Sequence, residues 1–111
     1  MSVEKNKNVA ETYHQMRADD VESILTPDFI GHGPNDFTWT RSDHVGFATN
    51  LKGSNTIHNI VAEGQYVVVH FHREGTFANF KFDSEMMHMM RLTDGKIAEI
   101  WEFMHSQPTE M

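Results

Sequence analysis

Histidine is the residue type in this sequence that is best suited to chemistry, and two histidines stand close together. Eight of the 111 residues are His and none is Cys. His70 and His72 lie two positions apart in the stretch GQYVVVHFHRE, just before Glu74. Two imidazoles at positions i and i+2 of a strand point to the same side, so they could bind one metal ion. They could equally cover the surface of a sheet.

The metal interpretation requires more ligands than this stretch supplies. The spacing from Gly64 to His70 and His72 resembles the opening of a cupin metal motif. That motif continues with a Glu further along than Glu74 and with a second segment containing Pro, Gly and a third His, and the sequence lacks both. Cupins are also nearly all β, whereas the first half of this chain has helical spacing. We therefore expect no metal and no other cofactor.

The composition and charge indicate a globular chain that forms one domain over residues 1–111. Its net charge is −7 and it has no cluster of Lys or Arg, which argues against binding to nucleic acid. No apolar run approaches the ~20 residues that a membrane helix requires, and the first residues contain no hydrophobic signal core. The absence of Cys agrees with a cytoplasmic location, which we expect.

Apolar residues recur at helical spacing in the first half of the chain. Residues 4–17 predict a helix whose inward side chains are Val9, Tyr13 and Met16. Residues 18–25 predict a second, short helix, which Pro27 stops. Residues 28–36 predict an extended piece that ends in a turn rich in Gly and Pro, and residues 43–52 predict a third helix with Val45 inward.

The second half of the chain predicts a sheet. From Thr56 onward the runs alternate or are rich in β-branched residues, and Asp94-Gly95 is a strong signal for a two-residue hairpin. Helices first and strands second indicate an α+β fold, in which the helices pack on one face of a strongly bent antiparallel sheet.

Alternation along the predicted strands divides their side chains between two faces. The face toward the helices receives Val67, Val69, Phe71 and Arg73, then His88, and in the last strand Ile97, Glu99, Trp101, Phe103 and His105. The outer face receives His70 and His72 together with Val68, Met87, Met89 and Ile100. A broad apolar surface of this kind usually contacts a partner, so we expect a homodimer through the outer sheet face.

Three segments of the chain resemble the SnoaL-like branch of the nuclear transport factor 2-like superfamily. They are DFIGHGP (28–34), IVAEGQYVVVHFH (60–72) and RLTDGKIAEIWEF (91–103). The closest likeness is to small SnoaL-like proteins described as polyketide cyclases or aldol-condensation enzymes. The resemblance implies a cone-shaped α+β fold with an internal, mostly apolar pocket. Ketosteroid isomerases, limonene epoxide hydrolases and polyketide cyclases share this fold and act through polar groups in the pocket, without metal.

The sequence departs from the family pattern where the polar residues of the pocket are expected. His88 stands where the family often has Asp, Ile100 replaces a usual His, and His105 stands nearest a usual acidic residue. The departures favour chemistry based on His, with His32 and His88 as acid and base and Tyr13 as a donor to a developing oxyanion, and the alternative is chemistry that rests on Asp36 or Glu99. The resemblance implies a substrate-binding set of Trp39, Phe71, Arg73, Glu99, Trp101, Phe103 and His105.

The function that we expect is that of a metal-independent acid–base enzyme of the polyketide cyclase, isomerase or epoxide hydrolase type. Its substrate would be a small apolar compound with a carbonyl or epoxide group. A non-catalytic ligand-binding or assembly module on the same fold is the alternative. An open pocket with convergent polar groups would favour the enzyme, whereas a dry, filled interior would favour the module.

Overall fold

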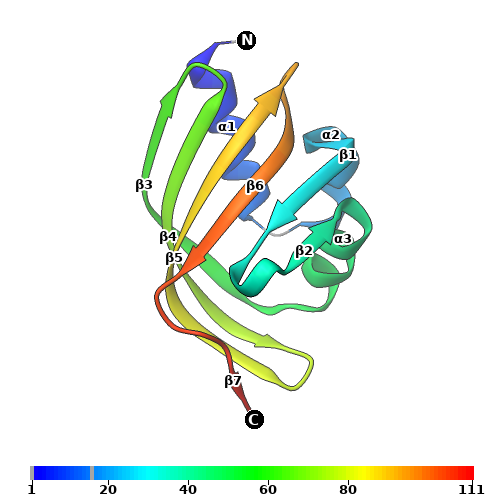
Figure 1. Ribbon diagram of the computed structural model, residues 1–111, viewed down its shortest axis with the longest axis vertical. Coiled ribbons are helices and arrows are strands. Elements are labelled where there is room, and N and C mark those ends of the chain that lie inside the picture. Colours follow the sequence, from blue (N-terminus) through cyan, green and yellow to red (C-terminus); the bar gives the residue numbers. More distant parts are fainter. Residues whose placement is uncertain (1, 16) are drawn as a thin grey trace.

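The computed structural model describes residues 2–15 and 17–111 as one bent sheet with helices on its concave side (Figure 1). The helices are α1 (Val3–His14), α2 (Val21–Ile24) and α3 (Arg41–Asn50), with short 3-10 turns η1 (Ala18–Asp20) and η2 (Pro34–Asp36). The strands are β1 (Leu25–His32), β2 (Thr38–Thr40), β3 (Lys52–Glu63), β4 (Tyr66–Phe77), β5 (Phe80–Thr93), β6 (Lys96–Met104) and β7 (Thr109–Glu110). Met16, which was predicted to face inward, lies outside the described residues.

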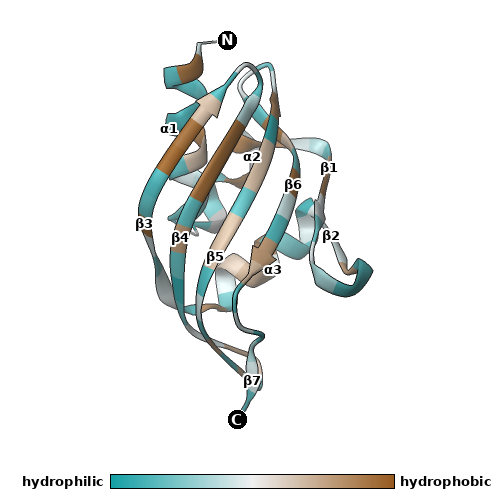
Figure 2. Ribbon diagram, turned by 60° about the vertical axis from the view of Figure 1, so that its left-hand side comes forward, coloured by the Kyte–Doolittle hydropathy of each residue, from teal (hydrophilic) through white to brown (hydrophobic). Residues whose placement is uncertain are grey.

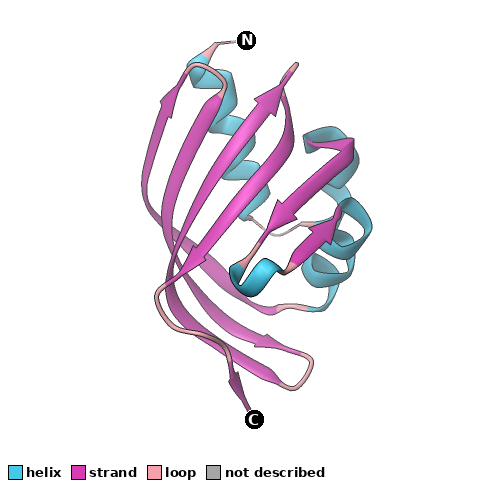
Figure 3. Cartoon of the chain, viewed as in Figure 1, coloured by secondary structure: helices cyan, strands magenta, loops and turns pink. Residues whose placement is uncertain are grey.

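The sheet has the strand order β2-β1-β6-β5-β4-β3, and β7 pairs with β5 beside this path (Figure 3). The α+β fold predicted from the sequence is confirmed. One pairing differs from the antiparallel expectation, because β1 runs parallel to β6. The sequence predicted only a short extended piece in this region, but the chain forms a full strand there and adds it next to the last long strand.

Helix α1 lies against the concave face of β3 and β4. Its N-terminus is capped by Ser2, whose hydroxyl accepts a hydrogen bond from the Lys5 amide at 3.1 Å. The side chains that it buries include Ala10, Tyr13 and His14. A buried histidine beside a buried tyrosine is unusual in a helix whose only role is packing. The C-terminal end of α1 is therefore a candidate for a functional site.

The core confirms the predicted inner face of β4 and shows why the prediction failed in β6. Val67, Val69 and Phe71 are fully buried. In β6, however, the pairing register with β5 shifts between Arg91 and Leu92, so that Leu92 faces Ile97.

The shift leaves Ala98 as an extra residue, a β-bulge that reverses the alternation of all later side chains in β6. Ile100, predicted on the outer face, is fully buried. Trp101 and Phe103 point outward, opposite the exposed Met89 and Met87, so their prediction as inner-face residues is wrong.

The backbones of β3 and β4 approach each other closely at a pair of glycines. Gly53 and Gly75 face each other there, and a Cβ atom on Gly53 would overlap the carbonyl of Glu74. Beyond this point the ends of β4 and β5 curl away from the main sheet (Figure 1). Phe77 and Phe82, which lie in these curled ends, line the cavity on the concave side.

In the part of the chain that the structure describes, no helix combines the length and the apolar character needed to cross a membrane.

Candidate functional site

A cavity of about 540 Å³ lies on the concave side of the sheet. Most of its wall is apolar and aromatic, and this part is made by Phe37, Trp39, Phe47, Phe77, Phe82 and Met104. Polar residues line the rest. Tyr13 of α1, His44 of α3, Arg73 of β4 and Glu102 of β6 reach it from different elements, and Asn35, Thr38, Asp43 and Gln107 also line it. An apolar cavity with a few convergent polar groups is the usual form of a small-molecule site.

A buried chain of hydrogen bonds ends at one of these groups, Glu102. His14 Nδ1 lies 2.7 Å from the Ala10 carbonyl oxygen, and His14 Nε2 lies 2.9 Å from His88 Nδ1. His88 Nε2 then lies 2.9 Å from Glu102 Oε1. His88 is fully buried and His14 nearly so, so water does not take part in these contacts.

The chain requires one more proton than two neutral imidazoles carry. Both ends can only accept, because the Ala10 carbonyl has no proton and the Glu102 carboxylate is ionised. Each of the three contacts needs one hydrogen, whereas neutral His14 and His88 supply one each. The fully bonded chain therefore holds one shared extra proton on its two rings, balanced by the charge of Glu102.

Burial makes this shared proton easy to lose. Burial lowers the pKa of His14 well below its ordinary value, and the charge of His88 acts in the same direction. Burial also lowers the pKa of His88, although the hydrogen bond to Glu102 partly opposes it. For Glu102, burial alone would raise the pKa, but the hydrogen bond from His88 and the charges of His88 and Arg73 outweigh it and lower the pKa. Burial thus favours the chain without the surplus proton, whereas the three hydrogen bonds favour the chain that holds it.

Arg73 holds Glu102 in place and brings a positive charge to the cavity. Its Nη1 donates to Glu102 Oε1 at 3.3 Å, and its Nε donates to the Asn55 side-chain oxygen at 3.1 Å. The guanidinium lies over the rings of Phe47 and Phe71, 5.2 and 5.4 Å from their centroids. These contacts fix the position and orientation of the guanidinium group. A positive group held in this way can stabilise negative charge on a bound molecule.

Tyr13 and His44 form a stacked pair in the cavity wall. Their ring centroids are 4.5 Å apart and their planes differ by 18°. Burial raises the pKa of the Tyr13 hydroxyl, so that it remains a proton donor. Burial and the positive charges of Arg73 and His88 lower the pKa of His44 to about 4. His44 is therefore neutral near neutral pH and can accept a hydrogen bond from a ligand.

The residues that the sequence assigned to the pocket divide between the two faces of the sheet. Tyr13, Trp39 and Arg73 line the cavity. His88 lies behind it and reaches it only through Glu102, while Phe71 is a core residue whose ring contacts His14 and His88.

His32 does not lie at the mouth of the cavity but on the outer face of the sheet. It stacks on Trp101 with a centroid distance of 5.6 Å, and its Nε2 lies 2.6 Å from Glu99 Oε2. Arg91 donates to the other oxygen of Glu99.

The last two predicted pocket residues also lie away from the cavity. Phe103 and His105 are exposed. The bulge at Ala98 explains why Glu99, Trp101 and Phe103 do not line the cavity, because it turns all three side chains to the outer face.

Three polar residues of the site were missed in the sequence. Glu102 faces His88 directly across β5 and β6, and it would have been found if the bulge had been visible. His44 was missed because the helix was phased with Val45 inward, whereas the capping box of Thr40 and Asp43 starts α3 earlier and Val45 is 38% exposed. No spacing in the sequence connects His14 with His88.

The sequence profile of the SnoaL-like domain matches residues 7–100. The chain belongs to the SnoaL-like family. No curated protein is significantly similar to it in sequence.

Solved structures share the SnoaL-like fold at low sequence identity. A protein named as a SnoaL-like polyketide cyclase from Jannaschia sp. CCS1 aligns with a TM-score of 0.76 and 16% identity over 91% of this chain and 85% of the other. One named as a ketosteroid isomerase from Kribbella flavida gives 0.74 and 18% over 95% and 81%. An epoxide hydrolase of LEH-like type from M. tuberculosis gives 0.77 and 14% over 92% and 84%. These likenesses establish the fold of this SnoaL-like chain. Its reaction has to be inferred from the residues of the site.

Proposed function

We propose that this SnoaL-like protein is an acid–base enzyme that acts on a small, mostly apolar compound with a carbonyl or epoxide group. The observation that carries the proposal is the buried hydrogen-bond chain from the Ala10 carbonyl through His14 and His88 to Glu102 at the cavity. Buried titratable groups that are hydrogen-bonded to one another beside a cavity, with pKa values shifted by burial and by neighbouring charges, are typical of sites that transfer protons.

In the proposed mechanism Glu102 is the group that exchanges a proton with the substrate. When the two rings hold the surplus proton, the chain can donate through Glu102 to a substrate carbon or oxygen. When the proton has left, Glu102 can accept one from the carbon next to a carbonyl or from water that attacks an epoxide. The Tyr13 hydroxyl and the Arg73 guanidinium stabilise the negative charge that develops on the substrate oxygen.

Isotope labelling tests the proposal without a known substrate. The protein is incubated with apolar ketones in heavy water and, separately, with apolar epoxides in water labelled with heavy oxygen. Mass spectrometry then detects proton exchange beside the carbonyl or opening of the epoxide. We expect labelling of one compound class, and we expect Glu102→Gln to slow it by about 10²–10⁴-fold.

Glu99→Gln is the matched control, because Glu99 lies on the same strand but on the outer face. It should label substrates at the wild-type rate. Equal labelling by wild type and Glu102→Gln would contradict the proposed role of Glu102. Tight binding of ligands without any labelling would support the alternative, a non-catalytic binding module on the SnoaL-like fold.

A further inference from the structure

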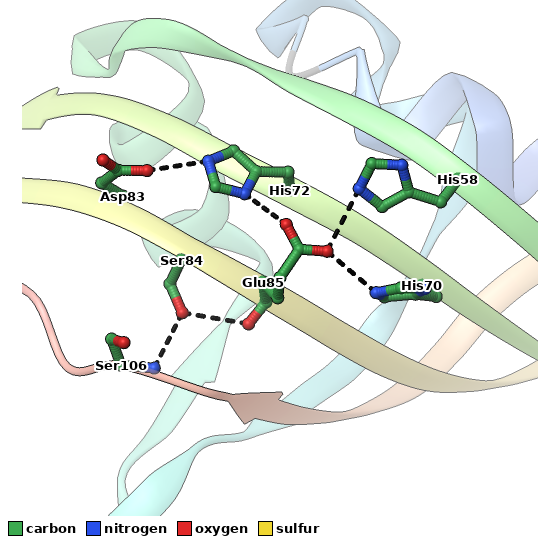
Figure 4. Close-up of polar contacts among 7 residues, drawn as sticks. All are labelled: His58, His70, His72, Asp83, Ser84, Glu85 and Ser106. Carbon is green, nitrogen blue, oxygen red and sulfur yellow. Dashed lines mark hydrogen bonds and ion pairs between the residues drawn. The ribbon is translucent and has the colours of Figure 1, made fainter.

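The outer face of the sheet carries a second cluster of titratable side chains, which is separate from the cavity. Three histidines, His58, His70 and His72, surround the carboxylate of Glu85 (Figure 4). They come from β3 and β4, and Glu85 comes from β5. None of these residues has a part in the proposed acid–base chemistry.

The sheet brings the four side chains together through a second β-bulge. His70 and His72 share a face of β4, and Glu85 lies directly opposite His72 on β5. In β3 the register shifts between Ile57 and Asn59, so that His58 is an extra residue beside His70. The bulge lets His58 point outward next to His70, and the centroids of the two rings are 4.9 Å apart. Bulges that redirect a side chain are frequent at functional sites.

The ligand atoms of this cluster have the spacing of a metal site. His70 Nε2 lies 2.9 Å and His58 Nε2 lies 3.1 Å from Glu85 Oε1, and the three atoms all lie within 4.8 Å of one another. A tetrahedral zinc ion with bonds of about 2.0–2.2 Å sets neighbouring ligand atoms roughly 3.3–3.5 Å apart. Small side-chain rotations would bring the three atoms to these distances.

We propose that His58 Nε2, His70 Nε2 and Glu85 Oε1 bind a divalent transition-metal ion of the zinc type, with water completing its coordination. Two imidazoles and one carboxylate suit zinc and its neighbours better than magnesium or calcium, which prefer oxygen ligands. In the single chain the side chains of the three ligands are 38–43% exposed, so an ion and its waters can reach them. We expected no metal because the stretch from Gly64 to Glu74 supplies too few ligands. The structure brings two further ligands, His58 and Glu85, beside His70.

Further contacts hold Glu85 in the orientation that the site needs. His72 Nδ1 binds the other carboxylate oxygen, Oε2, and His72 Nε2 lies 2.8 Å from Asp83 Oδ1. Oε1 is thus left to face His58 and His70 (Figure 4). Partners of this kind orient metal ligands in many proteins.

The backbone at Glu85 is also fixed. The Ser84 hydroxyl donates to the Glu85 carbonyl oxygen at 3.0 Å and accepts a hydrogen bond from the Ser106 amide at 2.8 Å. The His105 amide donates to the same carbonyl at 3.0 Å. The chain that follows β6 therefore anchors the backbone of Glu85.

A second group on the same face, His72, Glu74 and Asp83, is also close enough to hold an ion. It offers one imidazole and two exposed carboxylates, and exposed carboxylates gather on surfaces without binding a metal. The group of His58, His70 and Glu85 has two imidazoles on one oxygen, which favours it for a transition metal.

Zinc titration of the chain without a histidine tag, after dialysis against a chelator, tests the proposal. Isothermal calorimetry should show one zinc ion per chain. Cobalt in its place should give the visible absorption of a tetrahedral or five-coordinate site. His58→Ala and Glu85→Gln should each weaken zinc binding roughly tenfold or more, since each removes a ligand. Zinc should also raise the melting temperature of the wild type but not of these variants.

His32→Ala is the control, because His32 pairs with a carboxylate on the same face but has no second imidazole beside it. Its zinc affinity should equal that of the wild type. Circular dichroism shows that each variant is folded before titration. The proposal is overturned if the wild type takes up no zinc, if both ligand variants bind it as tightly as the wild type, or if binding depends on Glu74 and Asp83 but not on His58.

Discussion

At the scale of single residues, the site is defined by how many protons its groups can share. The three contacts from the Ala10 carbonyl to Glu102 are satisfied only when His14 and His88 together hold one proton more than their neutral forms. Burial lowers the pKa of both rings. Hydrogen bonding favours the extra proton and burial disfavours it, and the balance of the two decides whether the rings hold that proton.

His44 should make the stability of the protein depend on pH. Its pKa is about 4 in the folded chain, against about 6.5 in an unfolded one. Between these values the unfolded chain binds the proton more tightly, so the free energy of unfolding falls as the pH is lowered. His44 should contribute a loss of up to about 3 kcal/mol over this range.

Thermal melts at successive pH values, kept above about pH 4.5 so that most carboxylates stay ionised, measure this effect. His44→Phe keeps the stack on Tyr13 and removes the titration, so its melting temperature should fall less than that of the wild type. His14 and His88 titrate in the same direction and should leave a residual slope. Identical slopes for the two proteins would show that His44 is not the titrating group.

At the scale of elements, one glycine decides the shape of the cavity wall. A Cβ atom on Gly31 of β1 would overlap the indole ring of Trp39, which lines the cavity from β2. Gly31→Ala should therefore displace Trp39 and lower the free energy of unfolding by about 1–3 kcal/mol. Urea unfolding measures the loss, and the fluorescence of Trp39 should shift as its ring moves.

Gly46→Ala is the matched control for this prediction. Nothing lies within 4 Å of the Cβ position at Gly46, which is inside α3. The same substitution should there stabilise the protein by about 0.5–1 kcal/mol, because Ala favours a helix. A Gly31→Ala protein as stable as the wild type would mean that Trp39 has another position open to it.

The elements also show how far the sequence could be read. The three helices, the Asp94-Gly95 hairpin and the inner face of β4 follow from local patterns, since capping, turn and alternation signals lie within a few residues. The two bulges, at His58 and Ala98, leave no such signal, because they arise where two strands fit together. The bulge at His58 turns this histidine toward the outer cluster, which alternation along β3 alone does not predict. The bulge at Ala98 turns Glu102, instead of Glu99, toward the cavity. Nor could local patterns place β1 in parallel beside β6.

At the scale of the whole molecule, the outer sheet face remains our predicted homodimer surface. Apolar side chains are exposed on it, among them Val61 at 66%, Phe103 at 62% and Met87 at 44% (Figure 2 shows this sheet in front of the helices). A second copy related by a two-fold axis would cover these residues. Phe103→Asp should then weaken the dimer roughly tenfold or more, which sedimentation at several concentrations would measure.

Val3→Asp is the control, because Val3 is 41% exposed but lies at the start of α1, away from the sheet face. It should leave the association constant unchanged. A wild-type chain that sediments as a monomer at all concentrations would refute the predicted homodimer.

The parallel pairing of β1 with β6 has a consequence for how the molecule is assembled. The four strands from β3 to β6 are antiparallel neighbours in chain order. Each can therefore pair with the strand before it as soon as it has been synthesised. β1 precedes all of them, and its parallel neighbour is the last of the four. Leu25 and Phe29 of β1 therefore cannot be buried against the sheet until β6 has formed. β2, which carries Trp39, pairs with β1 and joins the sheet together with it. We expect the cavity to be the last part of the protein to form during folding, and β1 to be the segment most open to pairing with a wrong partner before then.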